Sequence, residues 1–143
     1  MTTQVKKVVP VIFRMDNNER QILVFRHQLA GIQIVKGTVE LNEHLETAAL
    51  RELFEESGIE NAVIQKFMGI HYPQQVGPHW YVYLCQVNEV LRDQWRHYCA
   101  DDGGLVFEFF WHPLKSLPTD EWHPLFQDLL KFIQSDGGVN SAK

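Results

Sequence analysis

Three glutamates, Glu52, Glu55 and Glu56, are the residues whose types and spacing point most directly to chemistry. On a helix turning about 100° per residue they share one arc, where neighbouring carboxylates repel one another by a few tenths of a kcal/mol per pair. A divalent cation would supply the missing positive charge. Oxygen ligands suit a hard ion such as Mg²⁺, which keeps several waters and completes its shell with substrate phosphate. The alternative is an ordinary solvated acidic helix face.

The segment from Gly37 to Ile59 must position these carboxylates. It starts as a glycine loop, becomes a helix near His44 or Leu45, and ends at Gly58, a residue type typical of helix C-termini. The arc beside the glutamates is apolar and can pack on a core; it contains Ala49, Leu50, Leu53 and Phe54. The segment therefore predicts a helix with one acidic and one buried face.

The same segment resembles the signature of the Nudix hydrolase family (MutT-like). That signature is Gly, five residues, Glu, seven residues, Arg-Glu, an aliphatic, any residue, Glu-Glu, any residue, Gly and an aliphatic. Every defined position is filled, by Gly37, Glu43, Arg51, Glu52, Leu53, Glu55, Glu56, Gly58 and Ile59. A chance match is very improbable at ordinary residue frequencies. Val35 and Asn42 stand where proline and glycine are frequent in the family. Both positions lie outside the signature's defined positions, so these departures bear on the detailed shape of the loop and not on the metal site.

The resemblance implies an α/β fold, a Nudix-type α/β/α sandwich with a mixed β-sheet, as a single domain over 1–143 with a flexible tail from about 135. It also implies an Mg²⁺-dependent pyrophosphohydrolase, with Mn²⁺ as a substitute ion. Such an enzyme cleaves a phosphoanhydride bond in a nucleoside diphosphate linked to another moiety, by attack of a metal-activated water. A metal ion suits this chemistry because it neutralises phosphate charge and makes a bound water more acidic.

By the same resemblance Glu52, Glu55 and Glu56 are the catalytic residues and metal ligands. Whether Glu52 is a ligand or the general base stays open. The backbone carbonyl of Lys36 is a further candidate ligand, and Glu40 in the loop another. The segment that carries the signature, Gly37 to Ile59, is called the box below. A further carboxylate ligand is expected after the box. Glu108 is the first candidate, and Asp101 and Asp102 are its rivals.

Four box residues are expected to support the loop rather than to react. Gly37 allows a close approach that a Cβ would block. Glu43 and Arg51 are expected to pair and to fix the loop onto the helix, while Gly58 ends the helix.

Four further residues are candidates for substrate binding. Tyr81 and Tyr83, with Trp80, are aromatic side chains able to stack on a base, although strands use such residues for the core more often. Arg26 is a candidate for steering phosphate; its alternative is an exposed strand arginine.

Periodicity predicts the elements around the box. Strands are expected at 7–14, 21–27, 62–71, 79–87 and 105–111, an extended piece at 31–36, and a second helix at 125–133. Pro10 indicates an edge or an irregular spot in the first strand. In 79–87, Trp80, Val82 and Leu84 alternate with Tyr81, Tyr83 and Cys85. The segment from Asn88 to Gly104 is predicted to be a long polar loop and a lid over the substrate.

Composition narrows the partners. A formal charge of −5 without a basic stripe argues against binding genomic nucleic acid, and no run approaches the ~18 apolar residues of a membrane span. Cys85 and Cys99 lack zinc or redox spacing, which with the absence of a signal-like N-terminus favours reduced thiols and a cytoplasmic location. Edge strands permit a homodimer without requiring one.

Two other functions compete with the hydrolase interpretation. One is a regulatory module that senses a nucleotide on the same fold, although the box has kept all its glutamates. The other is a protein-interaction domain using the Trp- and Phe-rich C-terminal half, which predicts an exposed aromatic patch and indifference to metal. The group attached to the nucleoside diphosphate stays open, with nucleotide sugars, ADP-ribose, dinucleoside polyphosphates and damaged nucleoside triphosphates all compatible with the sequence.

Overall fold

The structure is a computed structural model that describes residues 4–73, 77–100 and 103–135. The expectations for Asp101, Asp102 and the tail after residue 135 lie outside these ranges. In the described residues the elements are β1 (Lys6–Asp16), β2 (Glu19–His27), β3 (Gly31–Gln33), β4 (Gly37–Thr38), α1 (Leu45–Ser57), β5 (Ala62–His71), β6 (His79–Val87), β7 (Trp95–Cys99), β8 (Leu105–Pro113) and α2 (Pro124–Ser135).

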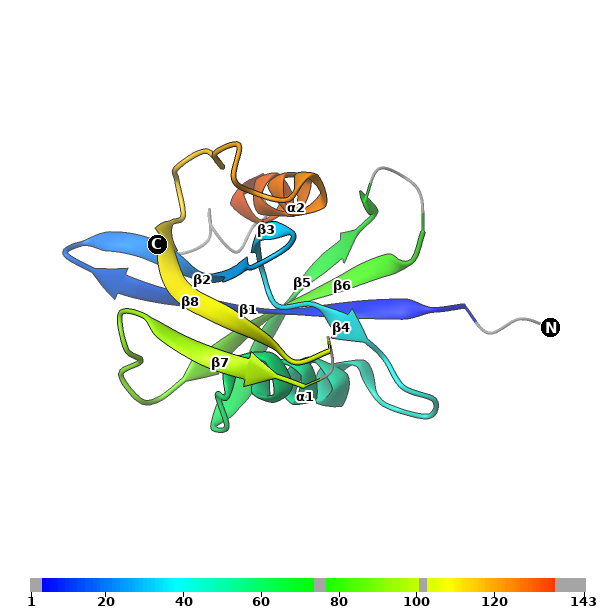
Figure 1. Ribbon diagram of the computed structural model, residues 1–143. Coiled ribbons are helices and arrows are strands. Elements are labelled where there is room, and N and C mark those ends of the chain that lie inside the picture. The colour runs from blue at the N-terminus through cyan, green and yellow to red at the C-terminus, as the bar shows by residue number, and fades with distance from the viewer. Residues whose placement is uncertain (1–3, 74–76, 101–102, 136–143) are drawn as a thin grey trace.

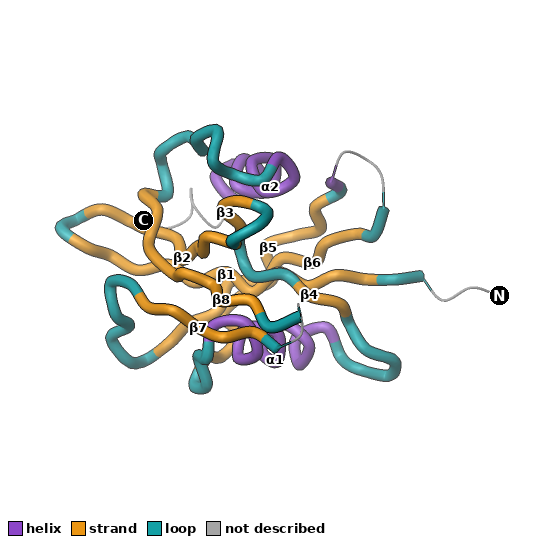
Figure 2. The backbone as a smooth tube through the Cα atoms, viewed as in Figure 1, coloured by secondary structure: helices purple, strands orange, loops and turns teal. Residues whose placement is uncertain are grey.

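One mixed sheet organises the molecule. Its strand order is β5-β6-β1-β2-β8-β7, with β3 paired to β2 and β4 paired to β1. The β1–β6 pair is parallel and the other strand pairs are antiparallel. Helix α1 covers one face of the sheet and α2 the other, which gives the three layers expected from the sequence (Figures 1 and 2).

The β1–β2 hairpin turns through Asn17 and Asn18, which have φ values of 50° and 64°. Two successive positive φ values define the turn that matches the twist of paired strands, and asparagine tolerates them well. Pro10 lies in the interior strand β1, between the residues that pair with β4 and those that pair with β2. Pro10 itself lies opposite Tyr83 of β6 in the parallel ladder, so it is an irregular spot inside the sheet and not a sheet edge.

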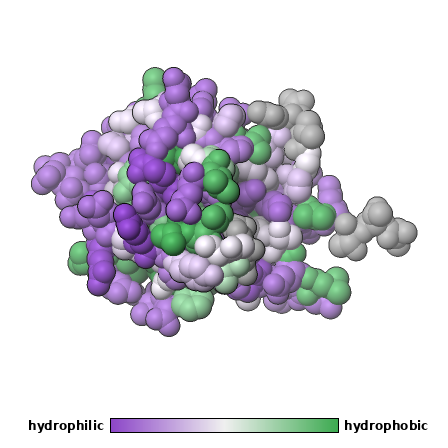
Figure 3. Space-filling view, in the orientation of Figure 1, coloured by the Kyte–Doolittle hydropathy of each residue, from purple (hydrophilic) through white to green (hydrophobic). Residues whose placement is uncertain are grey.

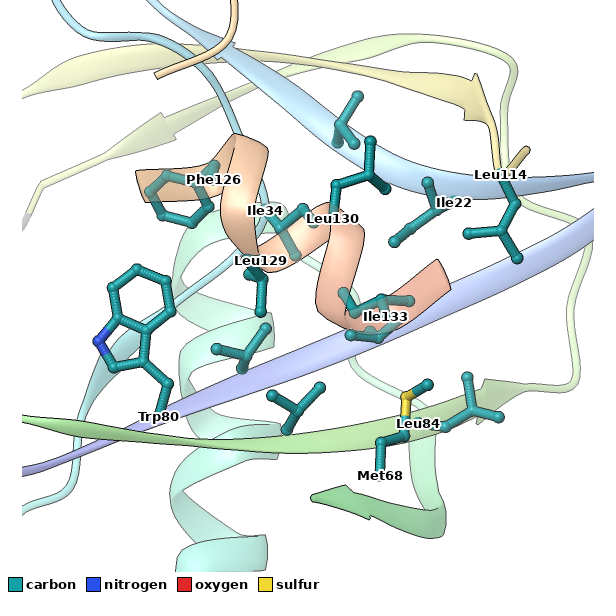
Figure 4. Close-up of a cluster of buried hydrophobic side chains, with 14 of the residues drawn as sticks. Ile22, Ile34, Met68, Trp80, Leu84, Leu114, Phe126, Leu129, Leu130 and Ile133 are labelled. Carbon is teal, nitrogen blue, oxygen red and sulfur yellow. The ribbon is translucent and has the colours of Figure 1, made fainter. Parts of the chain in front are cut away.

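Alternation along the strands divides the core between the two helices. Trp80, Val82 and Leu84 of β6 join the apolar cluster beneath α2 (Figure 4), whereas Tyr83 and Cys85 join the cluster beneath α1. The predicted alternation is therefore confirmed. Burial raises the pKa of the Cys85 thiol to about 12, so this thiol stays protonated and acts as an apolar core group.

The prediction of a long loop at Asn88–Gly104 is wrong. Within it, β7 pairs antiparallel with β8 along its whole length, from Trp95 opposite Phe109 to Cys99 opposite Leu105. Alternate residues of β7 are exposed, and they include Arg96 and Tyr98. This exposure explains why the segment looked polar. No helix in the described ranges is long and apolar enough to cross a membrane.

Candidate active site

A cavity of about 710 Å³ lies where α1 meets the ends of β2, β3 and β8. Its acidic side contains Glu52, Glu55 and Glu56 from α1 and Glu40 from the preceding loop. Its sheet side contains Phe25, His27, Gln33, Leu105 and Phe107. Lys36, Gly37, Thr38, Lys7 and Arg51 complete the lining. The structure therefore brings the three box glutamates together in one cavity.

The loop before α1 is packed directly against a catalytic candidate. An ideal Cβ on Gly37 would lie 1.8 Å from Cδ of Glu52, so no larger residue fits without moving that carboxylate. The Glu52 side chain is only 11% exposed as a result. Glycine at this position thus holds the loop backbone and the Glu52 carboxyl group in contact.

Arg51 joins the loop to the helix. Its Nε and Nη2 donate to the two carboxylate oxygens of Glu43 at 2.7 and 2.9 Å, and Nη2 also donates to the carbonyl oxygen of Thr38 at 3.0 Å. The hydrogen bonds from Arg51 lower the pKa of the Glu43 carboxyl group, which in turn accepts from the backbone N–H of Glu40. The expected Glu43–Arg51 pair forms, with the bidentate geometry that only arginine provides.

The same guanidinium contacts two of the three box glutamates. Its Nη1 lies 2.9 Å from Oε2 of Glu52 and 3.1 Å from Oε1 of Glu55. The prediction that the acidic arc lacks positive charge is therefore wrong. Arg51 supplies a cation at the side of the arc, which reduces the repulsion between the carboxylates. The hydrogen bonds to Glu43 and, next, to Glu52 raise the pKa of the Arg51 guanidinium.

The C-terminal end of α1 is held by β7. Gly58 ends the helix with φ 83°, in the left-handed conformation, and its N–H donates to the carbonyl oxygen of Phe54. Trp95 Nε1 donates to the carbonyl oxygen of Ser57 at 3.0 Å, and His97 Nε2 lies 3.0 Å from the carbonyl oxygen of Glu55. These contacts satisfy carbonyl groups that a helix leaves unpaired at its end. Strand β7 therefore supports the last turn of the acidic helix.

The donor chemistry of the cavity fits a hard cation. Its acidic side offers carboxylate oxygens, and the Lys36–Gly37 backbone lies beside Glu52, a set that suits Mg²⁺ or Mn²⁺ and not a thiolate-seeking ion. Among the described residues, no three His, Cys, Asp or Glu side chains already converge on one metal position. Because Arg51 bonds to Glu52 and Glu55, binding of a cation would exchange some of these contacts.

The structure does not bring Glu108 to this cavity. Glu108 alternates with Phe107 and Phe109, which face α1, and it lies on the opposite side of β8. There it is paired with Arg26 and Arg96 at 3.8 and 3.5 Å. A carboxylate on the far face of the sheet cannot share a metal with the box glutamates.

Arg26 lies on that same far face. Its guanidinium is hydrogen-bonded to Glu121 and stacks 4.9 Å from the ring centroid of Phe110. These contacts tie the segment before α2 to β2. Arg26 does not line the cavity, and its surroundings indicate a structural ion pair in place of the expected phosphate contact.

Tyr81 and Tyr83 also lie outside the cavity lining. Both pack on the α1 side of β6 with Phe67, whose ring centroid is 5.2 Å from that of Tyr83. Burial raises the pKa of Tyr83. The geometry thus favours the alternative stated for these tyrosines, a core role, over base stacking.

Sequence reasoning missed the sheet side of the cavity. Lys7 donates to Oγ1 of Thr38, and His27, Gln33 and Phe107 come from three separate strands. Phe25 and His27 lie two residues apart on β2 and so share one face, but their proximity to the box depends on strand order. No local motif signals it.

Comparisons with known proteins identify the family. The family model described as NUDIX domain matches residues 5–131, so the chain belongs to the Nudix family, whose hydrolases are pyrophosphohydrolases acting on acid anhydrides and typically use a divalent metal. The match spans β1 through most of α2, and thus includes both walls of the cavity.

Solved structures show the same fold at low sequence identity. A MutT protein from Methanosarcina mazei Go1 is 19% identical with a TM-score of 0.65, over 99% of this chain and 98% of that one. The Ap4A hydrolase of C. elegans is 16% identical with a TM-score of 0.63, over 98% and 100%. The NUDIX domain of Shewanella oneidensis NrtR, complexed with ADP ribose, is 14% identical with a TM-score of 0.63, over 94% and 88%. A search of curated proteins found no match.

Proposed function

We propose that this chain is an Mg²⁺-dependent pyrophosphohydrolase that cleaves a phosphoanhydride bond in a nucleoside diphosphate linked to another moiety, by attack of a metal-activated water. The observation that carries the proposal is the joint lining of one cavity by Glu52, Glu55 and Glu56. Basic residues lie in the same cavity, so it offers both metal ligands and counter-charges for phosphate.

In this proposal the three box glutamates and the backbone carbonyl of Lys36 would hold the metal. Bound Mg²⁺ supplies charge neutralisation of the phosphates and a lower pKa for a bound water. Glu40 faces the same cavity and takes the place given to Glu108 by the sequence as the carboxylate outside the helix. Glu52, held against Gly37, is positioned to ligate metal or to accept a proton from water.

The cationic side chains have separate tasks. Lys7 lines the cavity from β1 and contributes positive charge facing the phosphates. Arg51 fixes the orientation of the glutamates through the contacts already described. Lys36 directs its ammonium group away to the rings of Trp80 and Phe126, 4.8 and 5.8 Å from their centroids, which anchors the residue that offers the carbonyl.

The surface gives the interaction-domain alternative little support. On the face in Figure 3, hydrophobic residues form small groups among hydrophilic ones. The most exposed large apolar side chains, Leu29, Leu41 and Val90, lie in separate connecting segments. In the described part of the C-terminal half, every tryptophan and phenylalanine is buried or half-buried, so these residues form no exposed aromatic patch of the kind that marks a binding interface.

A substrate panel tests the proposal. Purified protein is incubated with ADP-ribose, nucleotide sugars, dinucleoside polyphosphates and oxidised nucleoside triphosphates, with Mg²⁺ or with excess chelator, and products are identified. ADP-ribose belongs in the panel because the similar Shewanella domain is complexed with it. Hydrolysis to two phosphorylated products, lost in chelator, is expected. Full turnover in chelator would refute metal dependence, and binding of a nucleotide without any turnover would favour the nucleotide-sensor alternative.

A further inference from the structure

The sheet side of the cavity carries two polar side chains that each keep a hydrogen-bonding group without a protein partner among the described residues. Gln33 of β3 is the cross-strand partner of Phe25, and His27 lies two residues further along β2. Residues directly opposite each other, and residues two apart on one strand, point to the same side of a sheet. His27 and Gln33 therefore project to the α1 side with Phe25, and both line the cavity.

A backbone hydrogen bond fixes the tautomer of His27. The N–H of Leu29 donates to Nδ1 of His27 at 3.0 Å, so Nδ1 must carry a lone pair. The neutral ring then bears its proton on Nε2. Within the described residues Nε2 has no protein acceptor, and it is not among the buried polar atoms that lack a partner. His27 thus offers the cavity a single, oriented N–H donor.

The His27 ring also packs, tilted by 38°, against the aromatic residues at the base of the cavity. Its centroid lies 5.3 Å from that of Phe107, which in turn stacks on Phe25 at 4.3 Å. Leu105 adds a partly exposed apolar side chain beside them. Phe25 and Phe107 are each only 1% exposed, so Leu105 and the ring of His27, both partly exposed, provide the apolar surface here. An apolar surface with polar groups at its border suits an aromatic ring that has hydrogen-bonding atoms on its edge.

We propose that His27 and Gln33 bind the base of the substrate and select a purine. The proposal rests on the proposed function, because it places the phosphates at the box glutamates at the other side of the same cavity. The two side chains are diagonal neighbours across β2 and β3, about 7–8 Å apart at their bases, a separation that a two-ring purine fills more completely than a pyrimidine. His27 donates to a ring nitrogen or carbonyl acceptor, and the Gln33 carboxamide both donates and accepts.

Binding of reaction products tests this without turnover. Titration calorimetry in Mg²⁺ buffer compares AMP, GMP, UMP and CMP with ribose 5-phosphate, which lacks a base. We expect wild-type protein to bind the purine nucleotides about tenfold or more tighter than the pyrimidine ones. His27→Phe keeps a ring against Phe107 and removes the donor, and it should weaken purine nucleotides about fivefold, the effect of one neutral hydrogen bond, while ribose 5-phosphate binding stays unchanged.

Two further variants separate recognition from damage to the fold. His27→Gln restores an N–H donor without the ring and should recover part of the purine preference. Gln33→Leu should lower that preference as His27→Phe does. Equal binding of all four nucleotides by wild type, or equal loss of ribose 5-phosphate and AMP binding in His27→Phe, would overturn the proposal. A protein that shows the purine effect and hydrolyses nothing would refute only the hydrolase function, whereas hydrolysis without any base effect would refute only this assignment.

Discussion

The two faces of the sheet use the same strands for different purposes. The α2 face is a continuous apolar core in which Leu129, Leu130 and Ile133 have no exposed surface (Figure 4). The α1 face has a comparable core under Leu53, but at the end of β2 and β8 it gives way to a polar cavity with a half-buried arginine and several carboxylates. Both sides of the sheet therefore carry a core, and the α1 side alone also carries the proposed site.

The difference shows in how charge is treated. On the α1 face Arg51 makes contacts with three glutamates at once, and such networks hold groups in fixed positions more than they stabilise a fold. On the α2 face the ammonium group of Lys36 lies over aromatic rings. Residues facing α1 at the cavity should therefore affect activity first, and residues facing α2 should affect stability first.

The largest expected effect on stability comes from the α2 face. Leu129→Ala leaves a cavity in the closed core and should lower the free energy of unfolding by about 2–5 kcal/mol. Catalytic efficiency per folded molecule should not change, because Leu129 does not line the active-site cavity. Urea unfolding and steady-state kinetics measure both quantities. Lys131→Ala, at an exposed position on the same helix, is the control. A loss of kcat/KM in fully folded Leu129→Ala protein would contradict the division of stability and activity between the two faces of the sheet.

On the α1 face the corresponding change is Arg51→Met. It removes the cation that orients Glu43, Glu52 and Glu55, and residues that orient metal ligands typically contribute about 10–100-fold to metal affinity or activity. Mn²⁺ affinity by calorimetry and kcat/KM should both fall in that range. Arg51→Lys keeps the charge without the forked geometry and should recover only part. Unchanged Mn²⁺ affinity in Arg51→Met would show that the guanidinium orients no ligand.

The smallest effect concerns His71 at the α2 face. Its ring packs against Trp80 and Phe132, its Nε2 is buried without a partner, and burial lowers its pKa against an opposing influence from Asp128. The His71 ring therefore binds a proton more readily in the unfolded chain than in the folded protein. The free energy of unfolding should fall as the pH drops below about 6.5, the ordinary pKa of histidine, toward the lowered pKa of the folded state. Hydrogen bonds from Arg51 and Arg26 lower the pKa values of Glu43 and Glu121 from 4.5, so the loss of stability on protonating these carboxylates begins at a lower pH than the loss from His71.

His71→Phe should remove that pH dependence. Urea midpoints at pH 5 and pH 8 would converge in the variant relative to wild type, with activity at pH 8 retained. An identical pH dependence in both proteins would show that His71 does not contribute to acid sensitivity.

Local patterns in the sequence predicted most of the framework. The strands at Ala62–His71 and His79–Val87 have the predicted bounds, and α1 starts and stops at its expected residues, because alternation and a helix-ending glycine are local signals. Strand β7 was missed since its exposed Arg96 and Tyr98 give a polar pattern that only pairing with β8 explains. Packing, and not propensity, makes it a strand.

The candidate site was likewise predicted where the signal is local and missed where it depends on strand pairing. The box fixed the positions of Glu52, Glu55 and Glu56 on one helix and their placement in one cavity followed. The face on which Glu108 and Arg26 lie is set by strand order and register, with Arg26 directly opposite Glu108. For the same reason, His27 and Gln33 became candidates only when β2, β3 and β8 were seen side by side.

The most direct test of the account is Glu56→Gln, measured for both turnover and thermal stability, with Glu55→Gln in parallel. Glu46→Gln is the matched control, because Glu46 is exposed on the same helix and does not line the cavity. If the glutamates bind metal, Glu56→Gln should lose at least about 10²-fold in kcat/KM, or ~2.7 kcal/mol of transition-state stabilisation.

Without metal, the same variant should melt at or above the wild-type temperature, because one repulsion is relieved. It should gain less than wild type when Mg²⁺ and nucleotide are added. Hydrolysis by Glu56→Gln at the wild-type rate, with an undiminished thermal response to Mg²⁺, would contradict the assignment of this carboxylate to a metal centre.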